Sequence, residues 1–171
     1  SGEPVLIDLP SVERKVLHEG RGGYCYELNN LYLALLQSLG FEARGISGRV
    51  VMGQPEGAWT ARTHRLSLVT LDGVRYISDD GFGGMVPTAP LLLDTADEQP
   101  TPHESYRIEQ HADGYTLSAR VADEWRAMYI FDLQRQEDID YAVGNWYVST
   151  HPQSPFARQL MVARTGEGWR R

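Results

Sequence analysis

Residues 21–40 read RGGYCYELNNLYLALLQSLG, and this stretch supplies the clearest element of the fold. Beyond Cys25 its apolar residues recur every three or four positions, which is the period of one face of an α-helix. They are Leu28, Leu31, Tyr32, Leu35, Leu36 and Leu39. Two glycines precede the pattern, and Gly40 ends it as glycine commonly ends helices. We therefore predict a helix over residues 24–39, with Cys25 in its first turn.

Downstream of this helix the apolar pattern changes to a period of two, which is typical of β-strands. Residues 64–71 and 74–79 alternate and flank Asp72-Gly73, a strong signal for a two-residue hairpin. We also predict strands at 50–52, 105–110, 115–121, 126–133 and 157–164, and short helices at 11–18, capped by Ser11, and at 137–144. One strong helix followed by antiparallel strands predicts an α+β fold, with the helix packed on an antiparallel sheet or barrel.

The charge balance restricts the class of partner. The 171 residues include 16 Lys and Arg against 23 Asp and Glu, a formal net charge of -7. Because phosphate recognition depends on clustered cations, we expect neither a nucleic-acid nor an anionic-membrane partner. No apolar run is long enough for a membrane-spanning helix, and the first residues lack the basic lead and apolar core of a signal peptide. We therefore expect a cytoplasmic protein, and the oligomeric state stays open.

Cys25 is the one cysteine, so neither an intramolecular disulfide nor a cysteine-rich zinc site can form. No two of the 5 histidines lie three to five residues apart, and we expect no metal. The position of Cys25 at a helix N-terminus favours a thiolate, because unpaired N–H groups and the helix dipole stabilise negative charge there. The lone thiol is therefore either a small buried apolar group or a nucleophile.

The predicted hairpin selects a partner for His64. With a two-residue loop, His64 and Asp79 are diagonal neighbours on one apolar face, with Cα atoms about 7–8 Å apart. The same register places Asp80 on the opposite face beside Arg65, where we expect a cross-strand ion pair. A β-bulge would reverse this choice between the two carboxylates.

Cys25, His64 and Asp79 together make a nucleophile, a base and a group that orients the base. Each also has a structural interpretation. A single cysteine is often a buried hydrophobe, a strand histidine is often a satisfied core residue, and an aspartate near glycine is often part of a turn. The residue pattern alone leaves both interpretations open.

The segment RGGYCYELN, residues 21–29, resembles the nucleophile motif R-G-G-x-C-x-E-x-N of the arylamine N-acetyltransferases. RTHRL at 62–66 resembles the histidine strand of that family, and DDGFGG at 79–84 resembles its D-V-G-F-G-G segment. The segments at 101–107 and 145–156 resemble the bacterial branch. The likeness covers nearly the whole chain.

The resemblance implies a papain-like cysteine-triad core and a ping-pong acetyl transfer without a metal. The Cys25 thiolate would attack acetyl-coenzyme A to form an S-acetyl enzyme. An arylamine, arylhydrazine or N-hydroxyarylamine would then take the acetyl group. His64 would act as base and acid, Asp79 would orient it, and the backbone N–H of Cys25 is a candidate donor to the oxyanion.

The resemblance also carries roles to neighbouring positions. Phe82 matches a residue that lines the aryl pocket, and an aromatic ring suits an aryl substrate. Thr63, Gly83 and Gly84 match residues near the pantetheine and phosphates of the cofactor. Glu27 and Asn29 also match the motif but have no assigned role. The Glu27 carboxylate lies in the first turn of the predicted helix, where the helix dipole stabilises negative charge.

By the same resemblance, residues 1–44 would end a helical domain, 45–164 would form a β-barrel domain, and 165–171 would begin a C-terminal region. Family members are longer at both ends, with a helical lead and a lid that helps to enclose the site. Asp80 stands where the family usually has a small apolar residue. A papain- or transglutaminase-like cysteine hydrolase and an inactive core fragment are the alternative interpretations.

Overall fold

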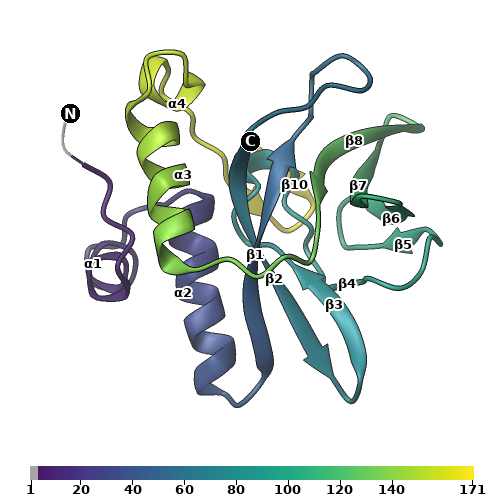
Figure 1. The fold of residues 1–171 in the computed structure, drawn as a ribbon, viewed down its shortest axis with the longest axis horizontal. Helices are drawn as coiled ribbons and strands as arrows, with labels where there is room; N and C mark the ends of the chain where they lie inside the picture. The colour runs from purple at the N-terminus through teal and green to yellow at the C-terminus, as the bar shows by residue number, and fades with distance from the viewer. Residues whose placement is uncertain (1–3) are drawn as a thin grey trace.

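The computed structural model describes residues 4–171. Helices lie on one side of a strongly curved antiparallel sheet, so the predicted α+β class is confirmed (Figure 1). The helical elements are α1 (Leu9–Glu13), the π-helix η1 (Arg14–His18), α2 (Cys25–Ser38), the 3-10 helix η2 (Gly83–Met85), α3 (Asp138–Thr150) and α4 (Pro155–Arg158). The main predicted helix is confirmed as α2.

Eight strands form the sheet in the order β4-β3-β2-β1-β8-β7-β6-β5, and β4 also contacts β6, so the sheet nearly closes. Their bounds are β1 (Glu42–Val50), β2 (Arg62–Leu71), β3 (Val74–Ser78), β4 (Leu91–Leu92), β5 (Gln99–Pro100), β6 (Ser105–His111), β7 (Gly114–Val121) and β8 (Glu124–Phe131). A separate small hairpin, β9 (Thr165–Gly166) and β10 (Trp169–Arg170), follows near the C-terminus. Pairing throughout is between antiparallel neighbours, which need only short connections.

The hairpin between β2 and β3 has the predicted register. Asp72 and Gly73 have φ values of 52° and 78°, as a two-residue turn that follows the twist of the strands requires. Leu71 pairs with Val74, and the ladder ends where Ser67 pairs with Ser78. Asp79 therefore leaves the sheet just after β3 and is held by side-chain contacts.

Three local predictions were wrong. The helix at residues 11–18 begins earlier, at Leu9, because Asp8 is its N-cap and accepts a hydrogen bond from the Ser11 amide at 3.0 Å. The strand expected at 50–52 ends at Val50 and extends back to Glu42, where glycines interrupt the alternating pattern. The strand expected at 157–164 does not form, since these residues include the end of α4 and an exposed segment with no neighbouring strand.

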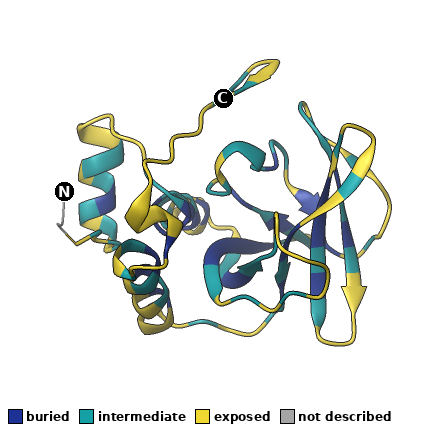
Figure 2. Ribbon diagram, turned by 90° about the horizontal axis from the view of Figure 1, so that it is seen from above, coloured by how far each residue is buried: buried dark blue, intermediate teal, exposed yellow. Residues whose placement is uncertain are grey.

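The helix expected at 137–144 is present but longer, since α3 continues to Thr150. The inner face of the curved sheet holds the main apolar core, while α2 and α3 pack on β2 from outside (Figure 2). A second cluster, made of Cys25, Tyr26, Tyr141 and Val148, joins α2 to α3. The nucleophile candidate thus sits where two helices meet the sheet.

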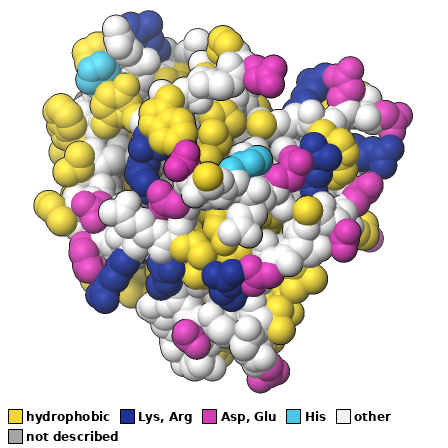
Figure 3. All heavy atoms as spheres, turned by 45° about the vertical axis from the view of Figure 1, so that its right-hand side comes forward, with side chains coloured by type: hydrophobic (Ala, Val, Ile, Leu, Met, Phe, Trp, Pro, Cys, Tyr) yellow, Lys and Arg dark blue, Asp and Glu magenta, His cyan; other side chains and the backbone are white. Residues whose placement is uncertain are grey.

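Acidic and basic side chains are intermixed on the face shown in Figure 3. Among residues 4–171, no helix combines the length and apolar character needed to cross a membrane. The proposed division at residues 44 and 164 stays a prediction.

Candidate active site

Cys25 is the first residue of α2, and its side chain is buried. Its Sγ lies 3.7 Å from the carbonyl oxygen of Thr63 on β2. The capping box at this helix start joins Tyr24 and Glu27, whose carboxylate accepts a hydrogen bond from the Tyr24 amide at 3.2 Å. The helix terminus that favours a thiolate is thus fixed in place against the histidine strand.

His64 lies on the inner face of β2 and is 2% exposed. Its Nε2 is 2.6 Å from Oδ2 of Asp79, so the predicted contact between the two residues is present. The imidazole ring packs against Phe82 and Tyr129, with ring centroids 5.0 Å and 4.8 Å away. The pair is therefore shielded from water on an aromatic surface.

The buried Asp79 carboxylate accepts more than the histidine bond. Oδ2 also accepts from the Tyr129 hydroxyl at 2.9 Å, and Oδ1 accepts from Asn29 Nδ2 and the Gly81 amide, each at 2.9 Å. Four donors therefore surround one carboxylate, which fixes its orientation and satisfies its charge away from water.

These contacts control the titration of the pair. Burial lowers the pKa of His64, but the charge and hydrogen bond of Asp79 and the contact with Cys25 outweigh it and raise that pKa from 6.5 to about 10. Burial raises the pKa of Asp79, but His64, Asn29 and Gly81 more than reverse this and hold it below its ordinary value. At neutral pH the pair is therefore an imidazolium and a carboxylate.

Cys25 is among the groups that raise the pKa of His64, and its Sγ lies against the carbonyl of Thr63, the residue before His64. Since Nε2 is engaged by Asp79, Nδ1 is the ring nitrogen that remains for the thiol. The structure thus brings all three predicted residues together, in the order thiol, imidazole, carboxylate.

Asn29 ties the elements of the site to one another. From one turn into α2 its Nδ2 donates to the Arg65 carbonyl on β2 at 2.5 Å and to Asp79, and its Oδ1 accepts from the Asp80 amide at 2.8 Å. The sequence pattern marked Asn29 only as a motif residue. The sequence offered one signal for the structural role of Asn29, which is a polar residue on the apolar side of a helix. No such signal distinguished Tyr129 from the other strand residues.

Gly81 is a second positioning residue that the sequence did not single out. A Cβ at this position would lie 2.5 Å from Cys25 Cα and 2.8 Å from Asn29 Nδ2. The backbone after Asp79 can therefore approach α2 only because residue 81 has no side chain.

Replacing Gly81 by Ala is expected to lower the free energy of unfolding by about 1–3 kcal/mol, because helix backbone and loop must separate. Urea unfolding of Gly81→Ala measures this change. Gly84→Ala is the matched control, since a Cβ there meets nothing within 4 Å. Equal stability of the two variants would contradict the close packing.

The other predicted residues lie at increasing distance from this centre. Phe82 contacts the His64 ring, and Thr63 presents its carbonyl to Cys25; the aryl-pocket role of Phe82 stays a prediction. Gly83 and Gly84 form the turn after Phe82, where Gly83 has a φ of 57°. Their predicted contact with a cofactor stays a prediction.

The prediction of an ion pair between Arg65 and Asp80 is wrong. Arg65 is buried, and its guanidinium carbon lies 4.1 Å from the centroid of the Tyr141 ring. Asp80 is exposed and lines a pocket together with Tyr32 and residues 86–90. The ladder ends at Ser78, so strand alternation no longer controls where Asp80 points. Desolvation and the charge of Asp79 raise its pKa.

The role of Glu27 extends beyond the helix dipole. Its carboxylate is nearly fully buried and lies 2.6 Å from Lys15 Nζ. The ion pair connects η1 to the start of α2, next to the nucleophile. Among the residues that the structure describes, no group of three His, Cys, Asp or Glu could hold a metal ion.

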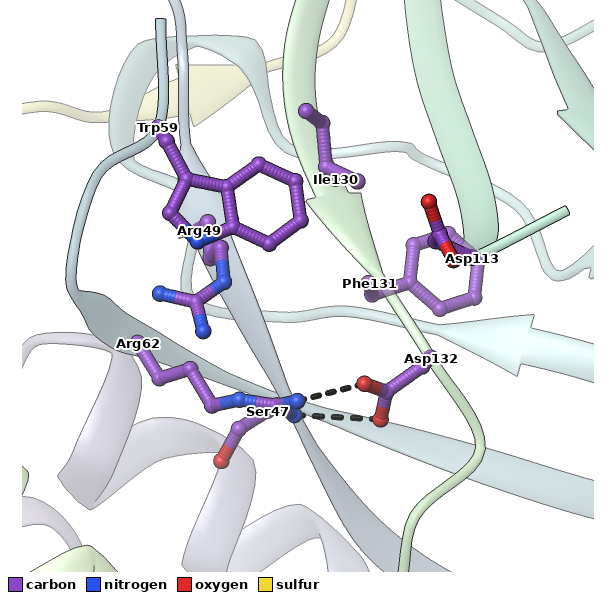
Figure 4. A pocket seen from close by; sticks show the side chains of 8 residues that line it. All are labelled: Ser47, Arg49, Trp59, Arg62, Asp113, Ile130, Phe131 and Asp132. Atoms are coloured by element: carbon purple, nitrogen blue, oxygen red, sulfur yellow. Dashed lines mark hydrogen bonds and ion pairs between the residues drawn. The ribbon is translucent and has the colours of Figure 1, made fainter. Parts of the chain in front are cut away.

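A pocket of about 290 Å³ lies elsewhere on the sheet and contains none of the three central residues (Figure 4). Its two arginines already have partners. Arg62 binds the Asp132 carboxylate with both terminal nitrogens, and Arg49 donates to the Thr60 carbonyl and stacks over Trp59. The Arg49 contacts fasten the loop between β1 and β2, and the Arg62–Asp132 pair joins the start of β2 to the end of β8.

Comparisons with known proteins agree with this geometry. A family profile described as N-acetyltransferase matches residues 1–170. The chain is 45% identical over 166 residues to arylamine N-acetyltransferase of Mycolicibacterium smegmatis, covering 95% of this chain and 60% of the relative. It is 40% identical over 160 residues to the arylamine N-acetyltransferase / N-hydroxyarylamine O-acetyltransferase of Salmonella typhimurium, covering 94% and 57%.

Among solved structures, that of Mycobacterium marinum arylamine N-acetyltransferase in complex with CoA superposes with a TM-score of 0.95. The two chains are 43% identical, and the match covers 99% of this chain and 64% of that one. The chain thus spans about three-fifths of the length of these relatives. With the profile match and the shared fold, the chain belongs to the arylamine N-acetyltransferase family.

Proposed function

We propose that this protein transfers an acetyl group from acetyl-coenzyme A to an aromatic amine, hydrazine or hydroxylamine through an S-acetyl-Cys25 intermediate. The observation that carries the proposal is the buried His64–Asp79 pair on the strand against which Cys25 is held at the start of α2. It supports a thiolate–imidazolium pair at the start of α2, which is the nucleophile that acyl transfer needs.

In the first half of the reaction the Cys25 thiolate attacks the thioester carbonyl. The bond from carbon to the coenzyme A sulfur breaks, and the His64 imidazolium supplies the proton with which coenzyme A leaves as a thiol. The backbone N–H of Cys25 points out of the helix start and is the candidate donor to the tetrahedral oxyanion. The acetyl group remains on the sulfur.

In the second half the amine nitrogen attacks the S-acetyl carbonyl, and neutral His64 accepts a proton from that nitrogen. The carbon–sulfur bond breaks, the acetylated amine leaves, and the thiolate–imidazolium pair forms again. Asp79 carries no proton in either half and keeps the ring oriented. Phe82 is the side chain beside His64 that would contact an aryl group.

The coenzyme A complex of the M. marinum relative supports acetyl-coenzyme A as the donor. Thr63, Gly83 and Gly84 are the residues we propose to lie along it, and a small aromatic amine is the acceptor that Phe82 favours. A cytoplasmic location, where acetyl-coenzyme A is made and a free thiol persists, is part of the same proposal.

The test is an intact-mass measurement after incubation with acetyl-coenzyme A, followed by peptide mapping. We expect one acetyl group on Cys25, its absence in Cys25→Ser, and its removal by aniline. A folded protein without any adduct overturns the proposal for this chain. Turnover of a glutamine peptide without an adduct would instead support a cysteine hydrolase.

A further inference from the structure

The C-terminal hairpin β9–β10 projects from the body of the molecule (Figure 2). Arg170 on β10 nevertheless points inward, and its side chain is only 12% exposed. Its Nε donates to Glu104 Oε1 at 3.0 Å, and one terminal nitrogen lies 2.5 Å from Oε2 of the same carboxylate. A fork-shaped contact of this kind fixes the orientation of the guanidinium.

The terminal nitrogens of Arg170 also reach the segment that follows Phe82. One donates to the Gly84 carbonyl at 3.1 Å and the other to the Val86 carbonyl at 2.8 Å. The carbonyl between them, that of Met85, accepts from the Tyr106 hydroxyl at 3.0 Å. Three consecutive carbonyls are therefore held by two side chains, although the segment itself contains one short 3-10 turn.

This segment continues from Phe82, which we take as the aromatic wall of the candidate site. Phe82, two residues before the first captured carbonyl, contacts the rings of His64 and Tyr129. Gly83 between them has a left-handed φ of 57°, and a Cβ on Gly84 would meet nothing within 4 Å. Phe82 and Met85 pack against the main core, while the glycines between them are held through the backbone carbonyls that Arg170 and Tyr106 bind.

By contrast, separate contacts hold the reacting groups. Asp79 is fixed by Asn29, Tyr129 and the Gly81 amide, and none of these bonds involves Arg170. Arg170 thus makes no direct bond to the groups that hold Asp79.

We propose that Arg170 is a positioning residue for the acceptor: through the Gly84 and Val86 carbonyls it sets where Phe82 stands, and so sets the affinity for the aryl amine without changing Cys25 chemistry. This inference rests on the proposed acetyl transfer. A hairpin remote in sequence thereby tunes one half of the reaction.

The experiment measures single-turnover removal of the acetyl group from S-acetyl-Cys25 at increasing aniline concentration. Arg170→Gln is expected to raise the half-saturating concentration about ten-fold, because a misplaced wall weakens acceptor binding. The maximal rate and the rate of Cys25 alkylation by iodoacetamide should stay within about two-fold. Arg170→Lys keeps the charge but not the fork, and should restore only part of the affinity.

Arg120→Gln is the matched control, since Arg120 forms ion pairs with Glu98 and Asp123 at the far end of β7 and should leave acceptor affinity unchanged. An unchanged half-saturating concentration in folded Arg170→Gln overturns the proposal. Arg170 would then only attach the β9–β10 hairpin to the rest of the protein. A ten-fold fall in the rate of Cys25 alkylation in Arg170→Gln would overturn the proposal as well, because the variant would then affect the nucleophile.

If Arg170→Gln does not fold, Glu104→Gln is measured instead, because it weakens the same contact with Arg170. It should raise the half-saturating aniline concentration by a smaller factor, and an unchanged value would contradict the proposal.

If the parent protein forms no acetyl adduct, NMR measures aniline binding to the iodoacetamide-blocked parent and variant. Weaker binding in the variant then supports the role of Arg170, and equal binding refutes it, while the acetyl-transfer proposal fails on its own.

Discussion

Replacement of Asp79 by Asn should reduce acetyl transfer by roughly 10³–10⁴-fold, the scale known for the loss of the orienting carboxylate in serine proteases. The change removes the charge that holds the pKa of His64 near 10. The Asn side chain can accept hydrogen bonds only through its oxygen, whereas its NH2 group would face donors among the four groups that now bond to Asp79. The imidazole would lose both its proton at neutral pH and its orientation. Turnover of acetyl-coenzyme A with aniline measures the effect.

Asp80→Asn is the control, because Asp80 is the adjacent residue with the same side chain but is exposed. We expect its activity to stay within about three-fold of the parent protein. Circular dichroism and thermal unfolding establish that both variants are folded. If folded Asp79→Asn kept activity within ten-fold of the parent, the orienting role assigned to this carboxylate would be wrong.

Alkylation of Cys25 at pH 6 should be about 100-fold slower in His64→Gln than in the parent protein. An ordinary thiol, with a pKa of about 8.5, is less than about 1% ionised at that pH. In the parent protein the pKa of His64, raised to about 10, keeps the imidazolium present from acid pH through neutrality. Its charge favours the thiolate over that whole range, so the rate should change little between about pH 6 and 8.

The measurement follows the loss of free thiol with iodoacetamide, an uncharged reagent that does not respond to the field of the site. His111→Gln is the matched control, since His111 is exposed at the end of β6 and its ring bonds to the Thr116 hydroxyl there. A rate that rises ten-fold per pH unit in the parent protein, as for an unassisted thiol, would show that no ion pair exists.

The elements that the sequence predicted well have local causes. The apolar stripe of α2 and the left-handed turn at Asp72-Gly73 depend on residues within a few positions of each other. The register of that hairpin predicted the contact between His64 and Asp79, although the ladder ends at Ser78 and side-chain bonds hold Asp79 there. The failures have other causes: the local cap at Asp8 moves the start of the first helix, and the apolar run at 157–164 forms no strand because it pairs with none.

The sequence by itself determined the helix that presents Cys25, the hairpin that joins His64 to Asp79, and the family that its motifs resemble. Only the tertiary structure decided how the site is held together. Asn29 and Tyr129 each reach Asp79 across 50 positions of chain, and Arg170 reaches Gly84 across 86. Such contacts depend on how the sheet curves and how helices pack on it, and no spacing rule along the chain records them.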